Sequence, residues 1–147
     1  EGRIKHVKIA LAAAMRGVGD EAENGLSYLR ALAHHQEQAG AAFLDVNVDE
    51  FSLKTEEQKS AMQWLVRAVQ NMSGLPLSVD SSDVAVIRAG LEAHDGSATR
   101  PLLNSASLER LEALDLALEH NAEVVVTAAG EKAMPSGTAE RVAMPRG

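Results

Sequence analysis

Apolar residues along the chain follow two spacings, one typical of amphipathic helices and one typical of buried strands. Helical spacing predicts an Ala-rich helix over about residues 4–15 and a second helix over about residues 21–39. Gly40 then stands just past a helix end, where glycine is common. Short apolar runs predict four strands, which cover about residues 42–48, 75–80, 101–104 and 122–127.

Each gap between the predicted strands carries a helix signal. Thr55 and Gln58 fit a capping box at the start of the first of these helices. Ser82 or Asp83 is expected to cap the second helix, and Ser107 the third. Because strands separated by helices cannot form hairpins, we expect parallel pairing with right-handed crossovers.

This order of elements predicts an α/β fold in a single domain over residues 1–147. Two architectures fit four parallel strands: half of a (β/α)8 barrel, or a small open α/β sheet. No G-x-G-x-x-G follows the first strand and no G-x-x-x-x-G-K-[ST] is present, which removes the main nucleotide-binding signals of open sheets.

Composition narrows the classes of partner. The 147 residues carry a net charge of −7 with no cluster of basic residues, which argues against nucleic acid and anionic membranes. No apolar run approaches the roughly 20 residues of a membrane helix, and no signal peptide is visible. The absence of Cys excludes disulfides and thiolate catalysis, and we expect a cytoplasmic protein. The five His residues are scattered, so no metal site is expected.

Polar residues stand at or near the ends of three predicted strands: Asp45 and Asn47, then Asp80, then Asn104. The carboxyl ends of parallel strands share one face, where active sites of barrels lie. Each residue taken alone could simply cap a helix or a turn, and Asp49 beyond the first strand reads as a solvated loop acid. The joint pattern across successive strands instead favours a binding site.

A carboxylate and two carboxamides offer hydrogen-bond acceptors and donors in a fixed array. Such a set suits a flat, neutral heterocycle such as a pterin, whose ring N–H and exocyclic amine can both donate to one carboxylate. The same residues provide little that looks like a nucleophile or a general base.

Three segments resemble motifs of the pterin-binding methyltransferases. Residues 40–48 (GAAFLDVNV) resemble their "GAD-x-hydrophobic-D-hydrophobic-N" strand, residues 77–82 (LSVDSS) their "hydrophobic-x-IDS" strand, and residues 103–107 (LNSAS) their "INS-x-S" strand. Residues 128–135 are similar to the loop after the next strand, and the resemblance extends over about residues 20–143.

The resemblance implies a TIM barrel that moves the N5 methyl of methyltetrahydrofolate to the cobalt of a corrinoid (cobalamin) carried by a partner protein or domain. It implies that Asp80 and Asn104 hydrogen-bond the pterin, and that Asp45 and Asn47 line the same pocket. The relatives include the folate domain of cobalamin-dependent methionine synthase and, more distantly, dihydropteroate synthase. The chain lacks the Ser-Thr-Arg-Pro loop that dihydropteroate synthases carry after this first strand.

The motifs match strands two to five of eight, and the Asn that the family uses to activate N5 falls on a later strand. We therefore expect the chain alone to be inactive in methyl transfer, and to form a homo-oligomer or associate through its open sheet edges. Two alternatives stay open: a non-catalytic module that binds a pterin or a partner, and a dihydropteroate synthase-like enzyme.

Overall fold

The computed structural model describes residues 2–107 and 110–127, with side chains from residue 6 onward. The predicted loop over 128–135 lies outside the described residues. In this described part of the chain, nine elements follow one another in the order that the sequence predicts. They are α1 (Gly2–Arg16), α2 (Asp20–Gln38), β1 (Leu44–Asn47), α3 (Thr55–Met72), β2 (Leu77–Asp80), α4 (Val84–Ala93), β3 (Leu102–Ala106), α5 (Glu112–Glu119) and β4 (Glu123–Val126).

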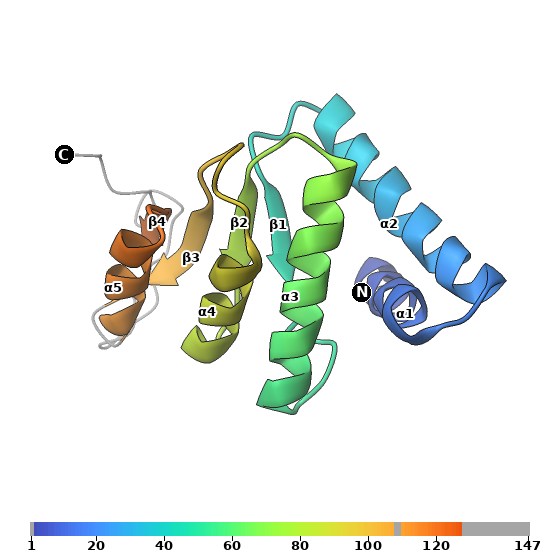
Figure 1. Cartoon of the computed structure of the whole chain (residues 1–147), viewed down its shortest axis with the longest axis horizontal. Coiled ribbons are helices and arrows are strands. Elements are labelled where there is room, and N and C mark those ends of the chain that lie inside the picture. The colour runs from blue at the N-terminus through green and yellow to red at the C-terminus, as the bar shows by residue number, and fades with distance from the viewer. Residues whose placement is uncertain (1, 108–109, 128–147) are drawn as a thin grey trace.

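The four strands form one sheet in the order β1-β2-β3-β4, and every neighbouring pair is parallel. Helices α3, α4 and α5 cross over between successive strands and lie along one face of the sheet, while α1 and α2 pack together beside the β1 edge (Figure 1). The prediction of an α/β fold with parallel strands and helical crossovers is confirmed, and the arrangement is that of part of a (β/α)8 barrel.

The core fills the space between the sheet and its helices. Val79 of β2 and Met62 of α3 are both fully buried there, which stabilises the fold by about 1.5–3 kcal/mol for each side chain. Gly90 of α4 faces both of them: a Cβ at Gly90 would lie 2.8 Å from Met62 Cγ and 2.8 Å from Val79 Cγ1. Glycine at this position therefore lets α4 lie directly against α3 and β2.

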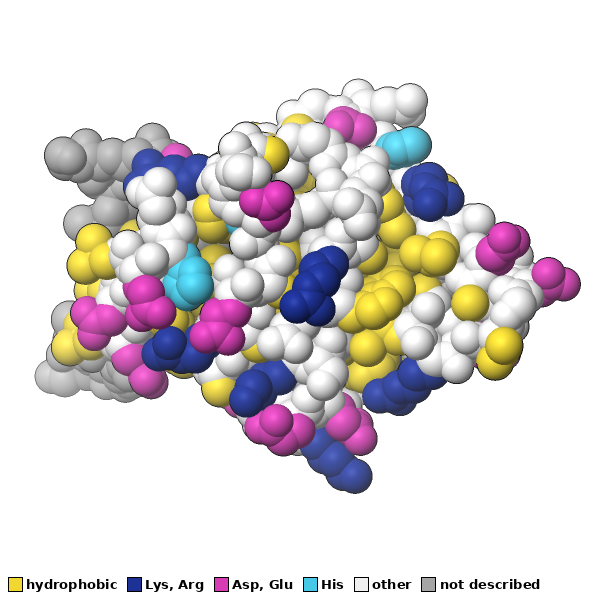
Figure 2. Space-filling view, in the orientation of Figure 1, with side chains coloured by type: hydrophobic (Ala, Val, Ile, Leu, Met, Phe, Trp, Pro, Cys, Tyr) yellow, Lys and Arg dark blue, Asp and Glu magenta, His cyan; other side chains and the backbone are white. Residues whose placement is uncertain are grey.

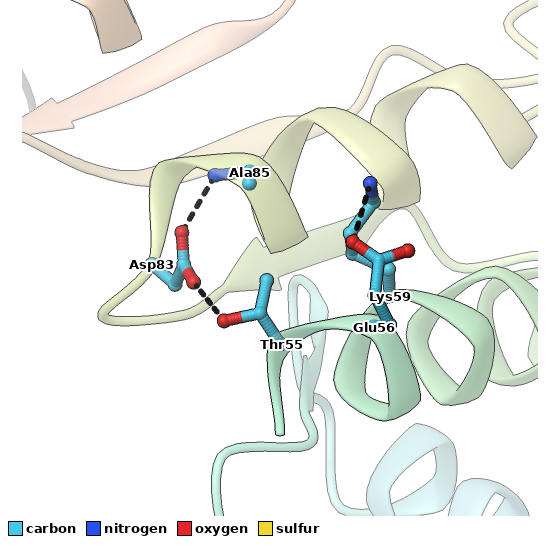
Figure 3. Close-up of polar contacts among 5 residues, drawn as sticks. All are labelled: Thr55, Glu56, Lys59, Asp83 and Ala85. Atoms are coloured by element: carbon cyan, nitrogen blue, oxygen red, sulfur yellow. Dashed lines mark hydrogen bonds and ion pairs between the residues drawn. The ribbon is translucent and has the colours of Figure 1, made fainter. Parts of the chain in front are cut away.

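The ends of two helices agree with the sequence. Gly40 follows the end of α2 with a φ of 87°, a left-handed conformation that glycine adopts without strain. Asp83 caps α4, because its Oδ1 accepts a hydrogen bond of 2.9 Å from the backbone N–H of Ala85 (Figure 3). Both predictions are confirmed.

The capping box at α3 was a wrong prediction. Lys54 is the N-cap residue and makes no side-chain capping bond. The Thr55 hydroxyl turns away and donates to Oδ2 of Asp83 at 3.0 Å (Figure 3), while Gln58 Nε2 donates to the Ser52 carbonyl at 2.6 Å. A distant residue, Asp83, thus takes up the Thr55 hydroxyl, while Gln58 bonds the carbonyl of Ser52, six residues before it.

The predicted cap of α5 was also wrong. Helix α5 begins at Glu112 after Leu111, several residues beyond Ser107. The Ser107 carbonyl instead accepts a hydrogen bond of 2.9 Å from the Arg110 backbone N–H.

Candidate functional site

The predicted polar residues form a row across three neighbouring strands. Asn47 pairs with Asp80, and Asp80 with Asn104, in the register of the sheet. Adjacent strands lie about 4.8 Å apart, so the three side chains stand side by side, with Asn47 and Asp80 as the last residues of β1 and β2 and Asn104 in the middle of β3. We call this set the polar row.

The register also fixes the face on which the polar row lies. The residues one position earlier, Val46, Val79 and Leu103, pair with one another and are at most 3% exposed in the core beneath the helices. Because successive side chains of a strand point to opposite faces, the polar row points away from α3 and α4. In a closed barrel, this second face is the interior.

Asp45 belongs to the same face, two positions before Asn47. It pairs with Ser78 of β2, and the Ser78 hydroxyl donates a hydrogen bond of 2.8 Å to Asp45 Oδ1. Ser78 is only 4% exposed, so a buried hydroxyl anchors the exposed Asp45 carboxylate. The structure therefore adds Ser78 to the predicted set. The sequence analysis missed Ser78, although its position two residues before Asp80 places both side chains on one face of the strand.

Asp80 is the electrostatic centre of the polar row. Burial, the nearby charge of Asp45 and a hydrogen bond with the Asp45 side chain together raise the pKa of Asp80 from 3.8 to about 6. A hydrogen bond with Asn47 acts in the opposite direction, and the Asp49 charge raises the pKa slightly. The Asp80 carboxyl is therefore ionised at neutral pH but titrates in the weakly acid range.

Asp49 is not the solvated loop acid that the sequence predicted. Its two carboxylate oxygens accept hydrogen bonds from the Ser81 hydroxyl at 2.7 Å and from the Ser82 backbone N–H at 3.0 Å. Ser81 is 2% exposed, and its carbonyl accepts a bond of 3.0 Å from Arg110 Nη2. Asp49 thus ties the loop after β1 to the loop that follows Asp80, a pairing of distant residues that sequence spacing cannot reveal.

A hollow of about 610 Å³ opens beside β1. Asp45 and Asn47 line it, together with Leu11 of α1 and Phe51, whose ring carries the Arg16 guanidinium 4.7 Å from its centroid. Asp80 and Asn104 share the same sheet face but do not line this hollow.

The donor set suits an organic ligand rather than a metal ion. Among the residues that the structure describes, no group of three or more His, Cys, Asp or Glu could hold a metal. The polar row, with Asp45 beside it, instead offers carboxylate acceptors at Asp80 and Asp45 next to carboxamides that both donate and accept.

Within the same described part of the chain, no helix is long and apolar enough to cross a membrane.

The family model described as "Pterin binding enzyme" matches residues 18–144. The chain belongs to this family of pterin-binding enzymes. The match spans all four described strands, and with them Asp45, Asn47, Asp80 and Asn104. Pterin-binding enzymes are TIM barrels, which agrees with the parallel sheet and its helical crossovers, and the family points to a pterin or folate as the small-molecule substrate.

Proposed function

We propose that the polar row binds the pterin ring of methyltetrahydrofolate, and that the chain is the pterin-binding part of an enzyme that passes the N5 methyl group to a corrinoid protein. The observation that carries the pterin assignment is the register Asn47–Asp80–Asn104, which presents a carboxylate between two carboxamides on one face of the sheet.

The ionised Asp80 carboxylate accepts from the ring N3–H and from the exocyclic amine of the pterin at once. Charge-assisted bonds of this kind are stronger than neutral ones. The flanking amides of Asn47 and Asn104 complement the ring carbonyl and the ring nitrogens, which need donors and acceptors in alternation. Asp45, whose Oδ1 accepts a hydrogen bond from the Ser78 hydroxyl, lies on the same face two positions before Asn47, and its charge raises the pKa of Asp80.

The methyl-transfer assignment rests on the three strand motifs and on the residues after the first of them. In the transfer, the N5–CH3 bond of methyltetrahydrofolate breaks, a Co–CH3 bond forms as Co(I) becomes Co(III), and N5 takes up a proton. We assign no residue of this chain to that proton. The Asp45-Val46-Asn47 strand lacks the Ser-Thr-Arg-Pro loop expected of dihydropteroate synthases, which favours the corrinoid-linked branch.

Calorimetric titration of the chain with tetrahydrofolate, under anaerobic conditions, tests the pterin assignment. Asp80→Ala and Asn104→Ala should each weaken binding by about tenfold or more, because each leaves donors or acceptors of the ring unpaired. Glu92→Gln, which removes one exposed charge from α4, is the matched control and should bind like the parent chain. Equal affinity for all four proteins would contradict the assignment.

Enzymatic assays on the longest natural protein that carries these 147 residues separate the activities. Formation of methylcobalamin from methyltetrahydrofolate and cob(I)alamin supports the proposal. Condensation of a dihydropterin pyrophosphate with 4-aminobenzoate would instead identify a dihydropteroate synthase-like enzyme. Pterin binding with neither reaction would identify a non-catalytic binding module.

A further inference from the structure

A second concave site lies on the opposite side of the molecule from the polar row, between helices α2 and α3. Its volume is about 400 Å³, and α2 and α3 supply all of its lining residues. Figure 2 shows this region as a band of apolar side chains between α3 and the α1–α2 pair, bordered by dark blue basic side chains. We call it the α2–α3 groove.

The floor of the groove is apolar. Trp64, Ala68 and Met72 follow one another at four-residue intervals on α3, so they share one face of that helix. They are all partly exposed, and Leu26 of α2 faces them from the other wall. The α3 residues span about 12 Å along the helix axis, which is the length of two helical turns.

The rim of the groove is cationic. Arg30 lies one turn after Leu26 on α2, and Arg67 lies one turn after Trp64 on α3, and both are exposed. Neither guanidinium has a carboxylate partner among the described residues, and no Asp or Glu lines the groove. The chain as a whole has a net charge of −7, whereas this apolar surface is bordered by two unpaired positive charges.

We propose that the α2–α3 groove docks an acidic amphipathic helix of a partner protein. An apolar stripe on such a helix fits the floor over two turns, and carboxylates flanking the stripe pair with Arg30 and Arg67. The Debye length is about 8 Å at physiological ionic strength, so the arginines that line the groove act on a docked segment more strongly than charges farther away. Glu37 does not line the groove, and its carboxylate accepts a hydrogen bond of 3.1 Å from Ser73, the residue after Met72. The distant acidic surface of the chain repels an acidic segment elsewhere and thereby directs it to the groove.

The shape of the groove favours a protein segment over a small molecule. Sites for small ligands bury most of the ligand surface between several walls. Here two helices provide both walls, and in the described part of the chain no third element contributes to the lining. The arginines belong to different helices, so a segment with carboxylates on both sides of its apolar stripe can pair with both.

Trp64 makes the proposal directly measurable, because it is the only tryptophan of the chain. The probe is a synthetic amphipathic peptide of about 15 residues, long enough to form helix, with Leu at helical spacing and Glu at the flanking positions. We expect a saturable change in Trp64 fluorescence on titration into the full chain. A peptide with Lys in place of Glu, and a scrambled peptide of the same composition, should bind about tenfold more weakly or worse.

Variants assign the binding to the groove. Arg30→Glu and Arg67→Glu should each weaken the acidic peptide about tenfold, and the double variant more, with unchanged circular dichroism. Arg88→Glu, at an exposed position of α4 outside the groove, is the charge-reversal control; it breaks the 3.8 Å ion pair with Glu119 but should leave the affinity unchanged. Arg30→Gln and Arg67→Gln provide milder changes that avoid new repulsion if a charge reversal impairs folding.

Three results would overturn the proposal. The first is equal binding of acidic and basic peptides. The second is arginine-dependent quenching of Trp64 by free 2-naphthoate without binding of the peptide, which would identify a small-molecule site. The third is a dimer in analytical ultracentrifugation that Arg67→Glu dissociates, which would identify a second copy of this chain as the occupant.

Discussion

Replacing Asp80 by Asn should stabilise the protein at pH 8 while it removes the acceptor proposed for the pterin. In the fold, burial and the Asp45 charge raise the pKa of Asp80 from 3.8 to about 6. A shift of about two pKa units corresponds to about 3 kcal/mol if it acts in full. Asp80 is only partly buried, so solvent screening reduces this to about 1–2 kcal/mol.

The sign of the effect follows from proton binding. The folded chain holds the Asp80 proton more tightly than the unfolded chain does, so the contribution of Asp80 to stability is most favourable below about pH 4 and falls as pH rises toward 6. Above pH 6 the full penalty of the ionised carboxylate remains. A carboxamide resembles the protonated acid and can still donate to Asp45. Asp80→Asn should therefore be more stable than the parent chain at pH 8, and most of this difference in stability should disappear near pH 4.5.

Urea unfolding followed by circular dichroism measures this difference. With an m-value of about 1.5 kcal/mol/M, a gain of 1–2 kcal/mol moves the midpoint by about 1 M at pH 8. Glu92→Gln removes an exposed charge and should leave the midpoint unchanged at both pH values. The reasoning fails if Asp80→Asn is less stable than the parent at pH 8, or if its advantage persists unchanged at pH 4.5.

Three further predictions concern the site and the core around it. Tetrahydrofolate affinity should be constant above pH 7 and fall about tenfold per pH unit below 6, because binding needs ionised Asp80; a flat pH profile from calorimetry would exclude this dependence. Asp49→Ala should lower the free energy of unfolding in urea by about 1–3 kcal/mol, since it breaks two hydrogen bonds to the loop after β2. Glu50→Ala, at an exposed position of the same loop, is the control and should change the free energy of unfolding little. Gly90→Ala should lower the free energy of unfolding by about 1–3 kcal/mol, because the new methyl group meets side chains of α3 and β2 at 2.8 Å. Gly74→Ala is the control, since its methyl group points into open space. Equal unfolding midpoints for the two variants would refute the packing argument.

The parts of the structure that sequence predicted are those governed by short-range periodicity. Strand β2 shows this well, since its alternation of Leu77 and Val79 with Ser78 and Asp80 places one pair in the core and the other on the opposite face. Three such strands in order were enough to predict that Asn47, Asp80 and Asn104 share one face of the sheet, whereas the pairing of Asp80 with both Asn residues comes from the observed register.

The parts that sequence missed depend on contacts between residues far apart in the chain. Thr55 looked like a local cap, but its hydroxyl donates to Asp83, a partner 28 residues away. Asp49 looked solvated, but Ser81 and Ser82 approach it only when β1 and β2 are already paired. Sequence spacing carries no information on such pairs, because each local choice is overridden by a partner supplied by the tertiary fold.

The hydrophobic core also fixes the geometry of the polar row. Val46, Val79 and Leu103 pair across the same three strands, one residue before the polar row. A slip of one residue in β2 would bring Asp80 into the core and expose Val79, at a cost of several kcal/mol for the buried charge and the lost apolar burial. The same register that buries these three aliphatic side chains therefore places Asp80 between Asn47 and Asn104. The position of the polar row is thus fixed by the burial of aliphatic side chains on the opposite face of the sheet. The raised pKa of Asp80 is the destabilising consequence of placing a carboxylate in the polar row.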